Sequence, residues 1–351
     1  YSGITVTGFK DVGGSTMTKY ENAEYNFKVR GKVAQFLFNG NYNSVYQNYH
    51  YYTATATSGN SPSTTTDRNN ENGSAVSFNG SSNYLDTNIT KLDGDFTLSA
   101  WINYTDAGAT RPIISKYNTS DADSQFNLQI DTNGNLNFFM GDGSGKGITL
   151  NGNNDPASDL IADNWYHVAV SMNGANGALY INGTETGSGS FTGTRQTGTN
   201  GINIGRYLSQ YFKGKIDDVH IYNYALTAAE IRSIYITEKT KVEVASILSP
   251  ANGTSDVSPD ANIVIRFSGS LDASTCGTMT FSQPNFTYTN GVNCSMSFTT
   301  TDVTNDTVII DPSTDFVGME YQIYSGINSI SGFKDAEGAD MKPYSSAYNF
   351  T

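Results

Sequence analysis

Short runs in which apolar and polar residues alternate recur along most of the chain. The run DFTLSAWINY (95–104) places apolar residues at every second position, at Phe96, Leu98, Ala100 and Ile102. Similar runs are AVSFNG (75–80), PIISKY (112–117), GINIGR (201–206) and FKGKIDDVHIYNYAL (212–226). A period of two indicates strands with one buried face. We therefore predict an all-β protein.

Two longer runs each predict a β-hairpin. FNLQIDTNGNLNFFMGD (126–142) carries Asn133 and Gly134 between two apolar runs, and this dipeptide favours the tight turn of a hairpin. NWYHVAVSMNGANGALYINGT (164–184) has the same form.

One segment, LTAAEIRSIY (226–235), predicts a helix. Thr227 is followed three residues later by Glu230, which is the spacing of a capping box at a helix N-terminus. Ile231 and Ile234 are predicted to face the core.

A second series of strand-like runs begins at Val244, after the charged linker TEKTKVE (237–243). NIVIRF, TMTF, CSMSFT, TVIID, EYQIYS, INSIS and AYNF follow one another at spacings of about 8–12 residues. This spacing is typical of an immunoglobulin-type β-sandwich.

The start of the chain repeats its end. The chain opens YSGITVTGFKD, and from Tyr324 it reads YSGINSISGFKD. The match continues, with Met17 corresponding to Met341 and Tyr25 to Tyr348, and the register changes by one residue before GFKD and again before YNF. The period is nearly the length of the whole chain, far longer than the roughly 20–50 residues of solenoid repeats. It indicates a multi-domain unit with a small overlap.

Composition and charge exclude several classes of function. Of the 351 residues, 37% are hydrophobic and 15% are charged, and the formal net charge is −13. This length predicts two domains. No run of Lys and Arg forms the basic face that nucleic-acid binding needs. No stretch approaches the roughly 18 consecutive apolar residues of a membrane span. We therefore predict neither nucleic-acid binding nor membrane insertion.

Candidate catalytic groups are scarce. The three histidines, His50, His167 and His220, have no nucleophile in a turn nearby, and structural roles are predicted for the last two. A glycosidase needs two carboxyl groups that flank the scissile bond. The nearest candidates, Asp217 and Asp218, are adjacent, and alternation along a strand would send them to opposite faces. We predict that the protein is not an enzyme.

The cysteine pair bears on the compartment. Cys276 and Cys294 bracket two strand-like runs, and an even cysteine count in a chain of this composition favours a disulfide and an oxidising, extracellular environment. Two buried, unpaired thiols are the alternative.

The first series of strands resembles the laminin-G-like jelly-roll family of concanavalin A-type domains. The resemblance covers residues 33–236 and includes FLFNGN, TTDRNNENGSAVSFNGSSNYLDT, DFTLSAWIN and FKGKIDDVHIYNYALTAAEI, in the order of the family. It implies two curved antiparallel sheets and use as an extracellular binding or spacer module. It also implies calcium and carbohydrate as ligands of some members.

The sequence departs from this family at NYNSVYQNYHYYTATA (41–56), where relatives carry a short polar stretch. The segment contains five tyrosines: Tyr42, Tyr46, Tyr49, Tyr51 and Tyr52. Three interpretations stay open for this cluster. The rings could stack on a glycan, they could form a protein–protein contact, or they could line a sandwich edge.

The second series, residues 244–351, resembles bacterial Ig-like domains that open with a Ser-Pro-x-x-Gly signature, here SPANG. Such domains usually serve as tandem spacers in adhesins. The overlap, residues 1–30, then corresponds to the closing strands of a preceding Ig-like domain. Two strands cannot bury a core alone. Residues 1–30 would therefore complete either the preceding domain of a tandem protein or the sandwich of a neighbouring copy.

Together these patterns predict an all-β extracellular or cell-surface protein with a laminin-G-like jelly-roll sandwich and an Ig-like sandwich. Its predicted function is that of a non-enzymatic structural and adhesive repeat unit, linked head to tail with neighbouring copies in a tandem surface protein or filament. The alternative is a carbohydrate-binding adhesin module, dependent on calcium, that has glycans as partners.

Asp217 and Asp218 are the candidate calcium ligands, because calcium takes about six to eight oxygen ligands and one of this pair could turn into the junction with the N-terminal strand. The other interpretation is that the buried carboxylate caps backbone N–H groups. Metal analysis of dialysed protein by mass spectrometry distinguishes them. A stoichiometric calcium content is expected for the first interpretation, and a content of zero would contradict it.

Overall fold

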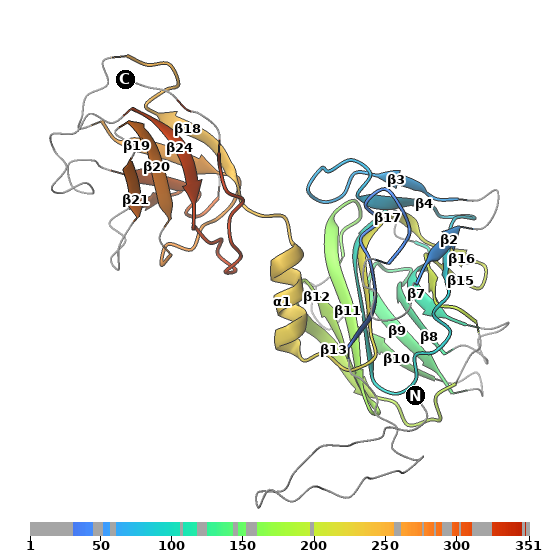
Figure 1. Ribbon diagram of the computed structural model, residues 1–351. Coiled ribbons are helices and arrows are strands. Elements are labelled where there is room, and N and C mark those ends of the chain that lie inside the picture. Colours follow the sequence, from blue (N-terminus) through green and yellow to red (C-terminus); the bar gives the residue numbers. More distant parts are fainter. Residues whose placement is uncertain are drawn as a thin grey trace, which may run out of the picture. The chain divides into compact units, whose positions relative to one another are not determined.

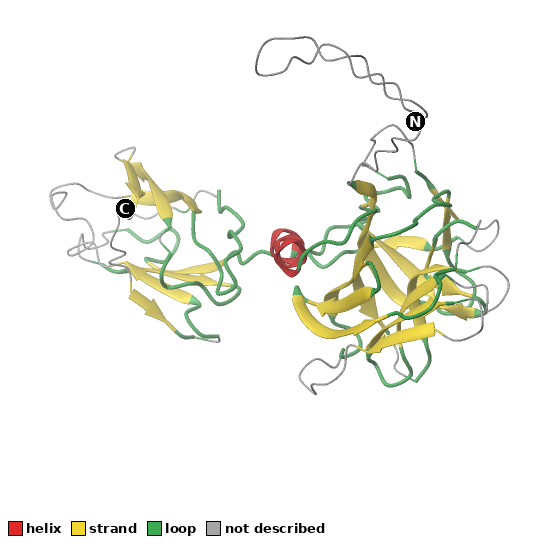
Figure 2. Ribbon diagram, turned by 90° about the horizontal axis from the view of Figure 1, so that it is seen from below, coloured by secondary structure: helices red, strands yellow, loops and turns green. Residues whose placement is uncertain are grey.

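The computed structural model describes residues 31–44, 52–56, 61–105, 108–117, 125–142, 147–151, 160–196, 200–255, 261–275, 277–283, 286–289, 297–301, 303–310, 325–345 and 348. The chain divides into two compact units (Figure 1). Unit 1 runs to Asp67 and from Glu71 to Thr227, and unit 2 comprises Arg68–Asn70 and the chain from Ala228. Strands dominate both units, as Figure 2 shows, and α1 (Ala228–Glu238) is the one helix within the described residues. The all-β prediction is confirmed.

Unit 1 is a sandwich of two antiparallel sheets. The front sheet has the order β13-β12-β11-β6-β17-β4-β3, with β1 also paired to β17. Its strands are β1 (Lys32–Phe36), β3 (Ser63–Thr65), β4 (Ala75–Asn79), β6 (Phe96–Tyr104), β11 (Trp165–Asn173), β12 (Asn176–Ile181), β13 (Thr184–Ser190) and β17 (Lys213–Tyr222).

The back sheet has the order β10-β9-β8-β7-β14-β5-β2. Its strands are β2 (Ala54–Ala56), β5 (Leu85–Thr87), β7 (Arg111–Lys116), β8 (Phe126–Ile130), β9 (Leu136–Gly141), β10 (Gly147–Asn151) and β14 (Asn203–Ile204). A short two-stranded ribbon, β15 (Arg206–Tyr207) and β16 (Gln210–Tyr211), follows β14.

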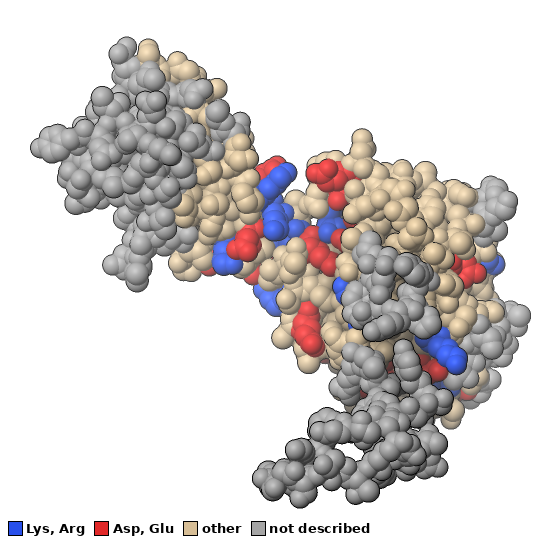
Figure 3. All heavy atoms as spheres, viewed as in Figure 1, with Lys and Arg blue, Asp and Glu red and all other residues tan. Residues whose placement is uncertain are grey.

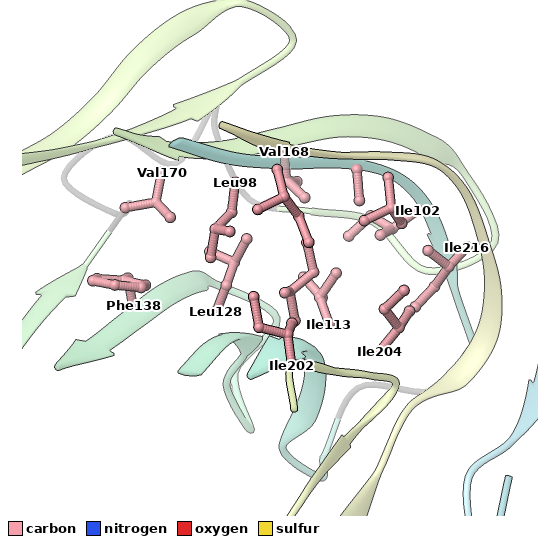
Figure 4. Close-up of a cluster of buried hydrophobic side chains, with 14 of the residues drawn as sticks. Leu98, Ile102, Ile113, Leu128, Phe138, Val168, Val170, Ile202, Ile204 and Ile216 are labelled. Carbon is pink, nitrogen blue, oxygen red and sulfur yellow. The ribbon is translucent and has the colours of Figure 1, made fainter. Parts of the chain in front are cut away.

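The core of unit 1 lies between these two sheets (Figure 4). Leu98 of β6 and Val170 of β11 point from the front sheet toward Leu128 and Phe138 of the back sheet, and all four are fully buried. The alternate residues of the same strands point away from this core. The period-two pattern of the sequence therefore records which side chains the two sheets enclose.

Both predicted hairpins are present. In the β8–β9 hairpin, Asp131 Oδ1 accepts hydrogen bonds from the backbone N–H of Asn133 at 2.8 Å and of Asn135 at 2.9 Å. Gly134 adopts a φ of 90°, which the turn requires and which glycine adopts without strain. In the β11–β12 hairpin, Asn173 pairs with Asn176 across a two-residue turn.

Unit 2 contains α1 and a second sandwich. One of its sheets has the order β18-β19-β23-β22 and the other has the order β21-β20-β24. The strands are β18 (Val244–Ser249), β19 (Ile263–Phe267), β20 (Thr278–Gln283), β21 (Phe286–Thr289), β22 (Ser297–Thr299), β23 (Thr307–Ile310) and β24 (Ser325–Ser331). The predicted Ig-like sandwich is thus present.

Helix α1 appears where the capping box predicts it, but its buried side chains are Ile231 and Tyr235, and Ile234 is only half-buried. A hydrogen bond and two ion pairs connect the end of the helix to the Ig-like sandwich. The Tyr235 hydroxyl donates to Glu337 Oε2 at 3.1 Å, and Lys239 pairs with Asp335 at 2.7 Å and with Glu337. Burial and the Glu337 carboxylate raise the pKa of Tyr235, so its hydroxyl stays protonated and donates this bond.

A bulge in β24 shapes the closing part of the Ig-like core. Ser329 pairs with Thr280 and Ile327 with Phe281, so Asn328 is an extra residue without a counterpart in β20. Ile327 and Ile330 are both fully buried although they are three positions apart. A bulge thus moves the alternation by one residue and keeps both side chains in the core.

Gly277 provides a test of how tightly this core is packed. A Cβ at this position would lie 1.9 Å from Phe333 Cε2, and the Phe333 ring is fully buried. Gly277→Ala should therefore destabilise unit 2 by about 1–3 kcal/mol through overpacking. Both tryptophans of the chain, Trp101 and Trp165, lie in unit 1. A calorimetric transition should accordingly move to lower temperature while the midpoint followed by tryptophan fluorescence stays unchanged.

Gly31→Ala is the matched control, since nothing lies within 4 Å of a Cβ at that position. Equal calorimetric traces for the two variants would contradict the packing described for Phe333.

Candidate functional site

The outer face of the back sheet carries a continuous polar row. Because the strand register sets side chains of neighbouring strands opposite one another, residues from five strands are brought into line: Asp86, Asn203, Ser115, Asn127 and Phe139. Their sequence neighbours Leu85, Ile204, Leu128 and Phe138 point into the core. The row therefore faces away from the core, and it combines amide, hydroxyl, carboxylate and aromatic groups.

A second row beside it consists of the amides Gln129, Asn137 and Asn151. We call these three residues, together with Asn127 of the first row, the amide cluster. Asn127 Nδ2 donates to Gln129 Oε1 at 2.5 Å, and Asn137 Nδ2 donates to Asn151 Oδ1 at 2.6 Å. Asn127 is 1% exposed, and its Oδ1 accepts no hydrogen bond from the described residues. Leaving a buried acceptor unsatisfied costs about 1–3 kcal/mol.

At one end of the polar row, three tyrosines surround an arginine. The carbon of the Arg206 guanidinium lies 4.5 Å from the centre of the Tyr84 ring, 5.6 Å from that of Tyr211 and 5.8 Å from that of Tyr117. We call these four residues the tyrosine clamp. Cation–π contacts of this kind contribute about 0.5–2 kcal/mol each. They hold the guanidinium in a defined position on the sheet.

The backbone around Arg206 directs its side chain toward the three tyrosines of the clamp. Gly205, with a φ of 83°, redirects the chain after β14, and a Cβ there would lie 2.6 Å from the Phe78 ring. Arg206 then pairs with Tyr211 across the β15–β16 ribbon, which places both on the same face. Arg206 Nε donates to the Leu208 carbonyl at 2.9 Å, so one edge of the guanidinium is anchored to the turn.

Charges of both signs meet at this end of the face. Asp86 is exposed, and Arg206 and the rings of Tyr84 and Tyr211 are half-buried. Partial desolvation raises the pKa of the Asp86 carboxyl, and the nearby charge of Arg206 opposes that rise. Burial also raises the pKa of Tyr117. The clamp and the neighbouring Asp86 thus bring a fixed donor, an exposed acceptor and aromatic surface together within one small area.

The predicted calcium ligands, Asp217 and Asp218, lie elsewhere, at a bulge in the front sheet. On one side β17 pairs with β4 up to Ile216 and then with β1 from Val219, so the two aspartates stand where the partner strand changes. Ile216 and Val219 both belong to the core although they are three positions apart. The regular alternation on which opposite faces were predicted for the two aspartates is therefore interrupted at this point of the strand.

The structure gives Asp217 a local role. Its Oδ1 accepts the backbone N–H of Asp218 at 2.7 Å, and Asp218 has a φ of 42°, in the left-handed region. Both side chains are buried, at 2% and 9% exposure. This is the capping interpretation left open by the sequence. Within the described residues, no group of three or more His, Cys, Asp or Glu side chains is arranged to hold a metal ion. Calcium binding stays a prediction.

Two of the five tyrosines predicted as a contact surface are described, and both are half-buried against the core of unit 1. The Tyr42 hydroxyl donates to the Pro62 carbonyl at 2.6 Å, its ring meets Phe38 edge-on at 6.4 Å, and burial raises its pKa. Tyr42 and Tyr52 therefore anchor their segment. The other three, Tyr46, Tyr49 and Tyr51, lie outside the described residues, as do Cys276 and Cys294.

The two described histidines are packed within the front sheet. His167 is fully buried, with its ring edge-on to Trp101 at 5.6 Å, and His220 is 1% exposed and stacks on Tyr222 at 6.2 Å. These contacts fit the structural roles predicted for both residues. No helix in the described part of the chain is long and apolar enough to cross a membrane.

The bulge at Asp217 can be tested by substitution. Asp217→Ala removes a buried acceptor and leaves the Asp218 N–H without it, which should destabilise unit 1 by about 1–3 kcal/mol. Asp217→Asn keeps an acceptor oxygen and should lose less. Thermal unfolding followed by tryptophan fluorescence reports on unit 1. A midpoint for Asp217→Ala that equals that of the unaltered protein would contradict the role described for this carboxylate.

Comparison with known proteins agrees with the two sandwiches. Residues 79–232 match the concanavalin A-like lectin/glucanases superfamily, and residues 238–351 match the bacterial Ig-like domain family. The comparison with curated proteins gave no significant match.

Solved structures with similar folds include domain 4 of AbnA, a GH43 extracellular arabinanase from Geobacillus stearothermophilus, in complex with arabinotriose. It is 19% identical, covers 59% of this chain and 100% of that one, and has a TM-score of 0.43. The heptameric SAP-like pentraxin from Limulus polyphemus is 21% identical, covers 46% and 81%, and has a TM-score of 0.38. The CBM40 of a Ruminococcus gnavus sialidase, bound to sialyllactose, is 16% identical, covers 46% and 96%, and has a TM-score of 0.39.

With all three TM-scores below 0.5, the assignment rests on the family matches and the strand order. The order predicted from the sequence, a laminin-G-like jelly roll followed by an Ig-like sandwich, is confirmed. The chain therefore joins a domain of the concanavalin A-like lectin/glucanases superfamily to a bacterial Ig-like domain.

Proposed function

We propose that the chain is an extracellular structural and adhesive unit, without enzymatic activity, that is linked head to tail with further copies of itself. In this proposal, residues 1–30 form the closing segment of a second Ig-like domain. The remaining strands of that domain come from another copy of the unit.

The observation that carries this proposal is that the repeated positions include the residues that the closing segment buries in the Ig-like core. Four side chains of the closing segment are almost fully buried in unit 2, namely Ile327, Ile330, Phe333 and Met341. Their counterparts in the repeat are all apolar: Ile4, Val6, Phe9 and Met17. Residues 1–30 thus retain the pattern that a closing segment needs in order to pack.

The one-residue change of register in the repeat falls at the bulge of β24. Aligning Ile4 with Ile327 and Val6 with Ile330 leaves one of Asn328 and Ser329 without a counterpart, and Asn328 is the bulge residue. Because residues 1–30 lack the bulge residue, Ile4 and Val6 stand two positions apart. In a strand without a bulge, side chains at this spacing point to the same face. This length difference therefore preserves the inward positions, which supports a strand equivalent to β24 in residues 1–30.

The described Ig-like domain already contains its own closing strand, because β24 pairs with β20 and Ile327 bridges to Tyr348. A complete domain of this kind offers no place for a second copy of β24 beside β20. This favours a preceding copy, joined in the same chain, over donation of residues 1–30 to a neighbour that is already closed. The fold supports the array part of the proposal, since β-sandwiches joined by short linkers are suited to extended arrays.

The absence of enzymatic activity is proposed from the surroundings of the candidate groups. His167 and His220 are enclosed by aromatic rings, and Asp217 holds the backbone N–H of Asp218. Each of these groups has a packing or capping role.

A second candidate function is glycan binding by unit 1. The polar outer face of the back sheet favours it, because amides, a carboxylate, an arginine and tyrosine rings are the groups that hold hydroxyl-rich ligands. The family match to lectins and glucanases supports the same class. The two functions are compatible, since an adhesive array needs a surface that binds.

The head-to-tail proposal can be tested with a chimeric chain in which residues 238–323 precede residue 1. The added front half and residues 1–30 together should form an extra Ig-like domain, seen as an additional cooperative transition in calorimetry. Phe9→Ala should lower the stability of that extra domain by about 3–5 kcal/mol, the cost of truncating a buried phenylalanine.

Lys10→Ala serves as the control. Its counterpart Lys334 is exposed and pairs with Asp340. The repeat has Thr16 at the position of Asp340, so it lacks the carboxylate of this ion pair. This change should alter stability by less than about 0.5 kcal/mol. A chimera that shows no additional transition, or one that Phe9→Ala leaves unchanged, would rule out the proposed role of residues 1–30.

A further inference from the structure

We infer that the tyrosine clamp and the amide cluster form one binding site for an uncharged oligosaccharide on the outer face of the back sheet. The inference rests on the proposed glycan-binding function and assigns it to residues outside the tyrosine segment at 41–56. Figure 3 shows that most of the described surface in that view carries neither Lys and Arg nor Asp and Glu.

The accessible groups of the site lie at its two ends. At the clamp, Asp86 is exposed and Tyr84, Arg206 and Tyr211 are half-buried. At the amide cluster, Asn151 is exposed, and Gln129 and the neighbouring Phe139 are half-buried. Between them lie the buried side chains of Ser115, Asn127 and Asn203. A ligand would therefore contact the exposed and half-buried side chains at both ends and pass over the buried groups between them without touching them.

The dimensions of the sheet favour an extended ligand. From β5, which carries Asp86, to β10, which carries Asn151, the strand order crosses β14, β7, β8 and β9. With neighbouring strands about 4.8 Å apart, this path is about 24 Å long. A chain of several sugar units spans that distance, whereas a single sugar would reach one end only.

The chemistry of the groups favours a ligand with many hydroxyls. Each hydroxyl donates and accepts, and the side-chain amides do both as well, while Asp86 accepts and Arg206 donates. The aromatic surfaces of Tyr84, Tyr211 and Phe139 suit the apolar C–H faces of sugar rings.

The balance of charge favours an uncharged ligand over an acidic one. Arg206 alone would attract a carboxylate, but Asp86 is close enough for their charges to act on each other. The amide cluster adds no charge. A negative ligand would therefore gain from Arg206 and lose against Asp86, while a neutral sugar can hydrogen-bond with both.

The clamp also explains why Arg206 is suited to binding. Cation–π contacts with three rings and the bond from Nε to Leu208 hold the guanidinium before any ligand arrives. Less side-chain freedom is then lost on binding, which increases affinity without additional contacts.

The test uses the full chain and titration calorimetry with four neutral hexasaccharides (of β-glucan, xylan, arabinan and mannan) and one acidic hexasaccharide of galacturonan. At least one neutral probe should bind, and Arg206→Gln and Tyr84→Ala should each weaken that binding at least tenfold. Asn151→Ala, at the far end of the site, should weaken it about threefold to tenfold.

Lys32→Gln is the matched control, because Lys32 forms a cation–π contact with Tyr222 on the front sheet, at 5.5 Å. It should leave glycan affinity unchanged. Asp86→Asn, an exposed and nearly isosteric change, provides a variant that is expected to fold. It should keep neutral binding within about threefold and give measurable binding of the galacturonan probe, since the charge of Arg206 is then unopposed.

The outcomes separate the site from the function. If no probe binds the unaltered protein, the glycan-binding function fails and the site fails with it. If a neutral probe binds but Arg206→Gln and Tyr84→Ala bind it equally well, the function stands and this site is wrong. If the galacturonan probe binds the unaltered protein more tightly than any neutral probe, the assigned class of ligand is wrong.

Discussion

A β-sheet can bury its apolar face only when another sheet covers that face, and both units of this protein are organised by this constraint. In unit 1, the inward side chains of β6 and β11 meet those of β8 and β9, and they are excluded from water. Burying one such side chain contributes about 1.5–3 kcal/mol. The inward positions are therefore committed to stability, and the outward positions of the same strands are free to carry polar groups. The amide cluster and the tyrosine clamp lie on strands or strand ends whose inward residues form the core.

The same constraint decides how much could be predicted from the sequence. Alternation of apolar residues revealed the strands, because it records burial directly, and the capping box revealed α1. A bulge has no such signature. At Asp217 and Asp218 the chain gains a residue, so alternation no longer determines the face on which each side chain lies. The tyrosine clamp was missed for another reason. Tyr84, Tyr117 and Tyr211 come from separate segments, and only the strand order brings them to one arginine.

The repeat gains a physical meaning once the Ig-like core is described. As a sequence, YSGITVTGFKD is a copy of YSGINSISGFKD with one residue fewer. In unit 2 the corresponding strand carries a bulge at Asn328, and its inward residues on either side are fully buried. The shorter copy has Ile4 and Val6 two positions apart, which is the spacing of inward residues in a regular strand. This agreement between a length difference and a bulge supports the proposed head-to-tail assembly.

Hydrogen exchange tests that connection most directly. In a chain that carries two successive copies of the Ig-like front half, amide exchange is measured by mass spectrometry for residues 3–9 and for residues 325–331. Head-to-tail closure predicts that the first segment exchanges as slowly as β24, because both sets of amides would lie in a sheet that opens only on unfolding. Exchange of residues 3–9 at the rate of an unfolded peptide, while β24 remains protected, would contradict the account.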